Sequence, residues 1–355
     1  MKAQLFLVIA VVQAIFFVLL IALIIINRAR RRLTGRSQET SSPAVALAFT
    51  RWLLGETTVD AVIETLRAAP PGVALEETLA ALSRRVPPAS RHEVVDRLRR
   101  EPWVRAMLAR ARGRAWWDRL AAARMLTAAG TALDRELLRR MLADVHPAVQ
   151  TAATGAIERI ADGPIVERVL DQLVSRPLVV RQIQMSALLR ARSLTVPALL
   201  ARLVPDSPPR SLEVWIGLAE QSTDPACIRA TAALSQHTDA QVRLAVARAL
   251  RHFYDPLVHE TLAALLRDDD WRVRAAACRT AGSLADTAFV GALRQGLGDR
   301  AWWVRFRAAL ALAQLGEPGR KVLREARSGD DRFAANMATM VSGLSDGGIL
   351  ELAES

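Results

Sequence analysis

Arginine recurs at a constant spacing in the C-terminal two thirds of the sequence. Seven positions follow one another at a step of 31 residues, and five of them are arginine. They are Arg119, Gln150, Arg181, Leu212, Arg243, Arg274 and Arg305. A guanidinium presents a planar fork of donors that holds a carboxylate or a phosphate by two parallel hydrogen bonds. The arginine column is therefore either one side of an internal ladder of arginine–aspartate pairs, or a row of cations facing an acidic peptide, a phosphate or a lipid headgroup.

Aspartate recurs six residues before the same positions. This second column contains Asp144, Asp206, Asp268, Asp299 and Asp330. An acid in the turn before a helix, or near its start, caps free backbone N–H groups and favours the positive end of the helix dipole. Because the acid recurs together with the arginine, we favour the internal ladder.

Tryptophan shares a third column, three residues before the arginine positions. Trp116, Trp271 and Trp302 stand there, with Trp117 and Trp303 beside two of them. A column repeated along a stack of units lies on one edge, so these rings could form an aromatic strip that anchors a partner. The alternative is that they wedge between adjacent units and seal the core. We favour the second, because buried large aromatic side chains usually serve packing first.

Residue patterns typical of catalytic or metal sites are scarce. The sequence contains no G-x-x-x-x-G-K-S/T, H-E-x-x-H, G-x-S-x-G or G-x-G-x-x-G motif. The His–Glu pairs at 92–93 and 259–260 are not separated by a multiple of the repeat step. Cys227 and Cys278 are distant and form no CxxC motif. We therefore expect no enzymatic activity, no cofactor and no metal site.

The three columns require helices to position them. Valine precedes the arginine position in five of seven units, and small residues follow three and four residues later, so one helical face can pack closely. A second apolar segment follows, for example at 135–142 and 262–266. A helical hairpin this small cannot bury its apolar face alone, and stacking buries it against the next copy. We predict an all-α fold, an α-solenoid (superhelix) of 31-residue hairpins.

This D…VR…AA pattern resembles the HEAT-like repeats, specifically the short class also found in phycobilin lyases, over residues 114–343. The resemblance implies that turn aspartates and helix arginines bond between or within repeats in a ladder. Asp268 with Arg274, and Asp299 with Arg305, fit that role. Some HEAT-like hydroxylases bind iron through His–Glu pairs repeated along the solenoid, but the two pairs here do not follow the repeat.

The middle of the repeat region departs from the pattern. Ser175 and His237 replace the aspartates that precede Arg181 and Arg243. Leu212 replaces an arginine outright, beside a proline-rich stretch at 205–209. We therefore expect a bend or a local break in the ladder there.

The regions that flank the repeats are less regular. Residues 44–113 are helical by pattern, with helices expected at 58–68, 75–86 and 91–100, and form an irregular N-terminal cap or divergent repeats. Proline clusters at 70–71 and 87–88 are expected to separate these helices. Residues 344–355, which include two glycines, are expected to be a flexible tail.

The N-terminus carries a long apolar segment. Residues 5–26 lack any charge and are broken only by Gln13, and as a helix they would span about 33 Å, enough to cross a hydrocarbon core. We predict an uncleaved transmembrane anchor at 1–27, followed by a basic and polar linker at 28–43. A cleaved signal peptide is the alternative, but no A-x-A-like site follows the segment. Five arginines follow it and Lys2 precedes it, which places the body in the cytoplasm.

The balance of charge favours a protein partner over nucleic acid. The formal net charge is +12, of which Lys2 and the five arginines supply six, leaving 42 basic and 36 acidic residues in the remainder. A net charge of +6 is weak support for a nucleic-acid-binding module. We predict a single-pass protein of the cell (inner or plasma) membrane that acts as a protein–protein interaction scaffold, for instance for a membrane enzyme or assembly. A lyase-like protein that handles a chromophore or cofactor is an alternative implied only by the resemblance.

Overall fold

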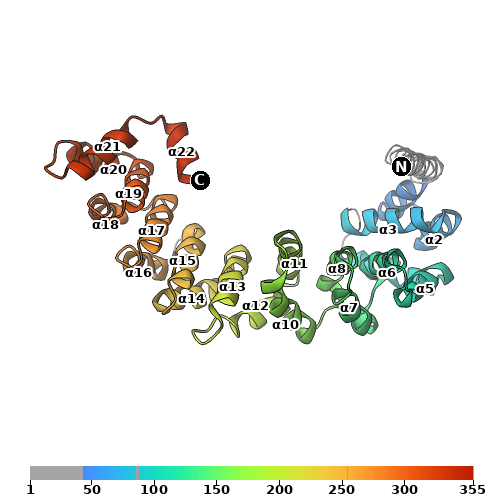
Figure 1. The fold of residues 1–355 in the computed structure, drawn as a ribbon. Coiled ribbons are helices and arrows are strands. Elements are labelled where there is room, and N and C mark those ends of the chain that lie inside the picture. The colour runs from blue at the N-terminus through green and yellow to red at the C-terminus, as the bar shows by residue number, and fades with distance from the viewer. Residues whose placement is uncertain (1–42, 85, 87, 254, 355) are drawn as a thin grey trace, which may run out of the picture. The chain divides into compact units, whose positions relative to one another are not determined.

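The computed structural model describes residues 43–84, 86, 88–253 and 255–354. Every regular element in these ranges is a helix, which confirms the all-α prediction for the part of the chain described. The chain separates into two compact units, which we call unit 1 (up to Ile160) and unit 2 (from Ala161). Figure 1 labels most of the α-helices of each unit.

Unit 1 begins with a helical segment at 43–53. It continues with α2 (Val59–Ala68), α3 (Pro71–Arg84), α4 (Pro88–Arg100), α5 (Pro102–Ala109), η1 (Arg110–Arg112), α6 (Trp116–Ala129), η2 (Ala132–Asp134), α7 (Arg135–Leu142), α8 (Pro147–Thr154) and α9 (Ile157–Ile160). The proline clusters lie at the boundaries between the early helices, and the second proline of each cluster begins a helix, α3 at Pro71 and α4 at Pro88. Proline suits the first helical position, because the N–H it lacks would have no intrahelical partner there.

Unit 2 consists of helical hairpins and a terminal helix. Its elements are α10 (Gly163–Gln172), η3 (Leu173–Ser175), α11 (Leu178–Arg190), α12 (Arg192–Leu200), α13 (Pro209–Ser222), α14 (Pro225–Ala233), η4 (Leu234–Gln236), α15 (Ala240–Ala249), η5 (Leu250–His252), α16 (Pro256–Leu265), α17 (Trp271–Ser283), η6 (Thr287–Phe289), α18 (Val290–Gly296), α19 (Trp302–Gln314), α20 (Gly316–Arg327), α21 (Arg332–Ser342) and α22 (Asp346–Glu354).

The predicted register of the repeat is confirmed by the helix starts. Seven helices begin at the position three residues before the arginine column, namely at Trp116, Pro147, Leu178, Pro209, Ala240, Trp271 and Trp302. Their starts follow one another at the predicted constant step, without an insertion or a deletion. The eighth helix of the series, α21, begins one residue early, at Arg332.

The hairpins of unit 2 stack in two layers (Figure 1). The first helices of the hairpins, α11, α13, α15, α17, α19 and α21, each pack against the next. The second helices pack likewise in the series α10, α12, α14 and α16, and again in the pair α18 and α20. The valines Val242, Val273 and Val304 are buried in the core. Stacked hairpins of this kind fit an α-solenoid.

The end of the chain differs from the prediction of a flexible tail. Residues 346–354 form α22, which packs against α19. Ile349 and Ala353 are buried, and Nη1 of Arg307 donates a hydrogen bond to the carbonyl of Leu352 over 2.7 Å. The two glycines stand in the first turn of α22, where they interrupt little of the helix. Apolar residues after them supply a face that α19 covers.

The predicted membrane anchor at 5–26, and the linker up to residue 42, lie outside the described residues. Among the helices that the structure does describe, none combines the length and the apolar character needed to cross a bilayer.

The first-helix layer is closely packed where α17 meets α19. Gly282 in α17 is buried there, and a methyl group on its Cα would lie 2.9 Å from both Cα and Cβ of Ala311 in α19. By contrast, nothing lies within 4 Å of the equivalent position on Gly291 in α18. The two helical glycines therefore offer a matched pair of substitutions.

We expect Gly282→Ala to lower the free energy of unfolding of the full chain by about 1–3 kcal/mol, because the added methyl group overpacks the contact between helices. Gly291→Ala should raise it by about 0.4–1 kcal/mol, since alanine restricts the unfolded chain without a clash. Chemical denaturation of both variants measures the difference. Equal stability of the two would contradict the close approach.

Candidate functional site

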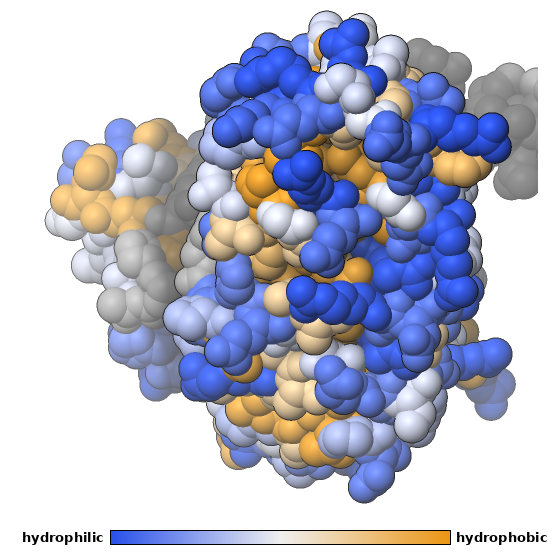
Figure 2. Space-filling view, turned by 90° about the vertical axis from the view of Figure 1, so that its left-hand side faces the viewer, coloured by the Kyte–Doolittle hydropathy of each residue, from blue (hydrophilic) through white to orange (hydrophobic). Residues whose placement is uncertain are grey.

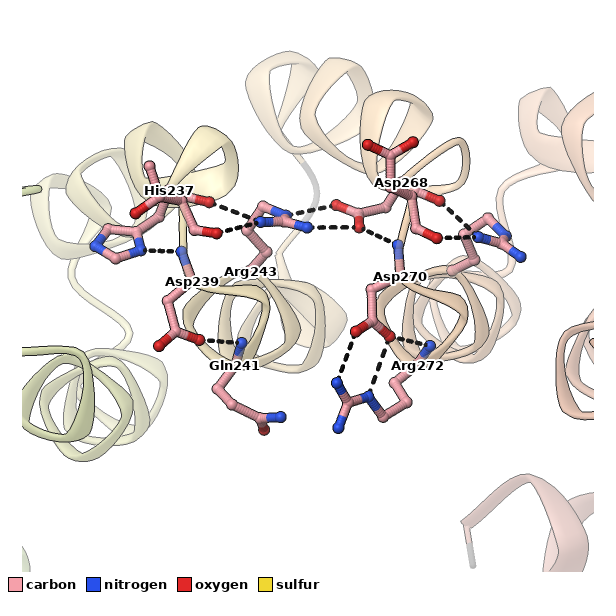
Figure 3. A network of polar contacts seen from close by, with 10 residues as sticks. His237, Asp239, Gln241, Arg243, Asp268, Asp270 and Arg272 are labelled. Carbon is pink, nitrogen blue, oxygen red and sulfur yellow. Dashed lines mark hydrogen bonds and ion pairs between the residues drawn. The ribbon is translucent and has the colours of Figure 1, made fainter.

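The arginine column forms a ladder with aspartates of the inter-repeat turns. Nε of Arg243 donates to Oδ2 of Asp268 over 2.7 Å, and its Nη2 donates to Oδ1 over 2.9 Å. The Nη1 group of the same arginine donates to the carbonyls of His237 and Thr238, in the turn before its own helix. One guanidinium thus joins two consecutive turns (Figure 3).

The same arrangement recurs in two other places. Arg274 binds Asp299 over 2.7 and 2.9 Å, and its Nη1 donates to the carbonyls of Asp268 and Asp269. In unit 1, Arg119 binds Asp144 over 2.6 and 3.0 Å. All three pairs are bidentate and mostly shielded from solvent, which makes them stronger than ordinary surface ion pairs.

The direction of pairing differs from the prediction. The expected pairs were Asp268 with Arg274 and Asp299 with Arg305. The carboxylate of Asp268 instead binds Arg243, and that of Asp299 binds Arg274. Each arginine therefore binds the carboxylate of the next turn, and not the one six residues earlier. Each arginine lies near the start of its helix, so the carbonyls of its own turn accept hydrogen bonds from Nη1. Its Nε and Nη2 groups remain available to bind the carboxylate of the next turn.

The ladder aspartates also shape the turns that they occupy. Oδ1 of Asp268 accepts a hydrogen bond from the backbone N–H of Asp270, and Asp270 caps α17 by accepting from the N–H of Arg272 (Figure 3). Burial would raise the pKa of Asp268, but the bonds from Arg243 and from the N–H of Asp270 outweigh it and hold this pKa below its usual value. The bond from the Arg272 side chain lowers the pKa of Asp270 to about 2.

The ladder is interrupted in the middle of the repeat region, where the sequence predicts a break. Arg181 donates to the carbonyls of Leu173, Val174 and Arg176 of its own turn. Leu212 is fully buried in place of an arginine.

The ladder also ends before the last arginine of the column. Arg305 donates through Nη1 to the carbonyls of Asp299 and Arg300, while its buried Nε has no hydrogen-bond partner among the described residues. Its guanidinium lies 5.1 Å from the ring centre of Phe333. Most guanidinium groups of the arginine column therefore make hydrogen bonds or ion pairs within the protein.

A substitution that breaks one rung should destabilise the fold. We expect Arg274→Gln to lower the free energy of unfolding by about 2 kcal/mol, because the shielded carboxylate of Asp299 loses its charged partner. Arg272→Gln is the control, since its pair with Asp270 is at the surface, and should cost less than about 1 kcal/mol. Denaturation of the full chain measures both, and similar losses would count against the ladder.

The ladder should also depend on pH. The bonds from Arg274 and from the N–H of Ala301 outweigh burial and lower the pKa of Asp299. A carboxyl whose pKa is lowered on folding stabilises the fold above about pH 4, its unfolded value, and this contribution is lost as the pH falls through the folded value. The difference in stability between the unmodified chain and Asp299→Asn, followed by denaturation at a series of pH values, should therefore narrow below about pH 4.

The tryptophan column is neither fully buried nor fully exposed. Trp116, Trp271 and Trp302 are 39%, 42% and 45% exposed. Trp116 stacks on His146 in the next turn, with ring centres 4.1 Å apart and planes inclined by 2°. One face of this ring contacts the next turn, but the rings of the column are exposed, so our favoured prediction that they are buried between adjacent units is wrong. The rings lie at the starts of their helices, where part of each side chain extends beyond the packed layer.

Aromatic side chains gather at the start of α19. Trp302 stacks on the buried Phe306 with ring centres 5.0 Å apart, and Trp303 meets Trp302 edge-on at 4.8 Å. Trp303 and Phe333 are each about half exposed. Figure 2 views unit 2 from the side of its C-terminal helices and shows apolar patches enclosed by hydrophilic side chains.

A groove of about 480 Å³ opens along the first helices of three adjacent repeats, α15, α17 and α19. Its lining residues are Glu220, Leu244, Arg248, Arg251, Trp271, Arg272, Ala275, Ala276, Arg279, Thr280, Ser283, Trp303 and Arg307. We call it the arginine–tryptophan groove. Trp271 belongs to the predicted column, whereas none of the groove arginines was predicted. Arg248 and Arg279 do stand one repeat step apart, so a further column could have indicated two of them.

The remaining sequence candidates lie apart from this groove. His259 stacks on Phe289 at 4.4 Å between ring centres, and its Nδ1 lies 3.3 Å from Oδ2 of Asp286. Cys227 and Cys278 are buried free thiols, and burial raises the pKa of Cys278 to about 12. In the described ranges, no three histidine, cysteine or acidic residues gather where they could hold a metal ion.

Part of the repeat region is similar to a known protein family. Residues 258–341 match the family model for HEAT repeats. The matched range runs from α16 to α21 and includes the rung between Arg274 and Asp299. No curated protein matches the chain.

Two solved structures align with most of the chain. Human deoxyhypusine hydroxylase in complex with glycerol shares 20% identity over 69% of this chain and 96% of its own, with a TM-score of 0.31. An engineered protein shares 17% identity over 78% of this chain and 96% of its own, with a TM-score of 0.20. At such scores, neither likeness bears on what this chain does.

Proposed function

We propose that the chain is a membrane-anchored scaffold that binds a protein partner through unit 2 at the cytoplasmic face of the membrane, and that it is not an enzyme. The observation that carries the proposal is the exposure of Trp271, Trp302, Trp303 and Phe333 at the starts of three consecutive first helices. Tryptophan and arginine dominate the binding energy of protein interfaces, and here both line one groove.

The chemistry of the groove supports binding in preference to catalysis. Its lining contains neither histidine nor cysteine. Its two hydroxyl groups are engaged with backbone carbonyls, since Thr280 donates to Ala247 over 2.6 Å and Ser283 donates to Arg279 over 3.1 Å. The one carboxylate of the lining, Glu220, is paired with Arg251 over 2.9 Å. HEAT repeats themselves also favour a role in protein interaction.

The membrane part of the proposal rests on the sequence. Residues 5–26 are apolar and long enough to span a bilayer, and five arginines follow closely. A tether at this end confines the repeats to the layer next to the membrane. A partner held there meets the groove at a raised effective concentration.

Crosslinking from the groove tests partner binding. A photo-reactive phenylalanine analogue in place of Trp303 should give one discrete adduct in native membranes, because the side chain lies on the proposed interface. The same analogue in place of Leu133, which is 92% exposed in unit 1, is the control and should give none. Adducts that are absent, or equally frequent at both positions, would contradict the proposal.

Fractionation tests the anchor separately. We expect the full chain to remain in the membrane pellet after an alkaline wash, because a spanning helix resists extraction. A variant without residues 5–26 should move to the soluble fraction. In sealed inside-out vesicles, added protease should digest the repeats of the full chain. Recovery from the soluble fraction of a natural chain that lacks this apolar segment would contradict the anchor.

A further inference from the structure

The arginine–tryptophan groove carries more positive charge than its own acids neutralise. Five arginines and one glutamate line it. Arg248 projects from α15 into this lining and is exposed, and among the described residues no acid or carbonyl contacts its guanidinium. The charge of Arg248 is therefore not balanced by an ion pair within the described residues.

A second cation in the groove is held close to a like charge. Arg307 of α19 is half-buried, and both burial and the neighbouring charge of Arg279 lower its pKa. A guanidinium stays protonated despite such a shift, so Arg307 keeps its positive charge. The carbonyl of Leu352, in the last turn of α22, accepts a hydrogen bond from Arg307. The partial negative charge at the end of a helix thus already lies at this side chain.

Two of the other groove arginines are paired with acids. Arg251 pairs with Glu220 over 2.9 Å, and Arg272 pairs with Asp270 over 2.7 Å. Arg248 and Arg307 make no ion pair with an acid among the described residues, so the excess positive charge of the groove lies at these two side chains. Two separate cations suit a ligand with two or three separate carboxylates, whereas a long polyanion such as nucleic acid would also meet the carboxylates of the two ion pairs.

We propose that this groove binds an acidic segment of a protein, whose carboxylates pair with Arg248 and Arg307 while apolar side chains between them pack on Trp271 and Trp303. The inference rests on the proposed function, since it names the chemistry of the partner. Arginine suits carboxylates because its fork binds both oxygens. The tryptophans and alanines of the lining suit the apolar side chains.

The spacing of the repeats predicts the spacing of the acidic residues in the bound segment. Neighbouring helices pack about 8–10 Å apart, so equivalent side chains of α15 and α17 are separated by about that distance. An extended peptide of the polyproline type rises about 3.1 Å per residue. Arg248 on α15 and Arg307 on α19 are two such steps apart, so acids about six residues apart in such a peptide match them, and a glutamate at every third position supplies such a pair.

A fluorescein-labelled peptide with glutamate at every third position and apolar residues between them is the probe. We expect its fluorescence anisotropy to rise on binding the full chain in detergent at about 150 mM salt, where weak surface attraction is screened. Arg248→Gln and Arg307→Gln should each weaken binding about tenfold, because each removes a charge-assisted pair. The guanidinium of Arg248 has no polar contact to lose in the described part of the chain, so its variant tests the groove without disturbing the fold.

Three controls make the outcome decisive. Arg294→Gln alters an exposed arginine on α18, in the other layer, and should leave binding unchanged. A peptide with glutamine in place of glutamate should not bind. A dT oligonucleotide, phosphatidylserine vesicles and inorganic phosphate compete as other anions, and groove-dependent binding of any of them in place of the peptide would overturn the proposal.

The proposal would also be overturned if Arg248→Gln and Arg307→Gln left the affinity for the acidic peptide unchanged, or if the peptide did not bind at all. A discrete crosslinked adduct at Trp303 without peptide binding would refute only the acidic chemistry of the partner. The absence of both would refute the scaffold too.

Discussion

Each complete rung of this chain consists of one guanidinium that holds a carboxylate of the following turn and the carbonyls of the preceding one. Because the group is planar and rigid, it fixes the distance between consecutive turns as well as their attraction. In a solenoid every repeat contacts only its neighbours, so long-range order depends on these nearest-neighbour links. The layer of first helices, and with it the spacing of the groove arginines, depends on the rungs from Arg243 and Arg274.

The interrupted part of the ladder is held by packing instead. Leu212 is buried where an arginine would stand, and the indole N–H of the buried Trp215 donates to the carbonyl of Leu170 over 3.1 Å, joining α13 to α10. Replacing a buried ion pair by apolar side chains often costs no stability, because two charges no longer lose their hydration. What is lost is the directional link, so the middle repeats have a weaker geometric constraint than the repeats on the C-terminal side.

The sequence alone predicts the helices and their register well, because a valine, an arginine and small residues recur on one face at a constant step. The direction of pairing escapes this reasoning, since Asp268 lies near Arg274 in the sequence, while its carboxylate binds Arg243. The groove shows the same limit. Arg248 and Arg279 form a column, but Arg307 stands elsewhere in its repeat, and only the stacking of α17 on α19 brings it beside Arg279.

The terminal helix α22 has a consequence for how molecules meet one another. A stack of hairpins ends in an apolar face that could receive the first hairpin of a second molecule, and such head-to-tail contacts do not close but grow into fibres. Here Ile349 and Ala353 of α22 are buried, and Asp346 pairs with Arg320 of α20 over 2.9 Å. This short helix thus covers apolar surface of α19 and removes that surface from contact with a second molecule.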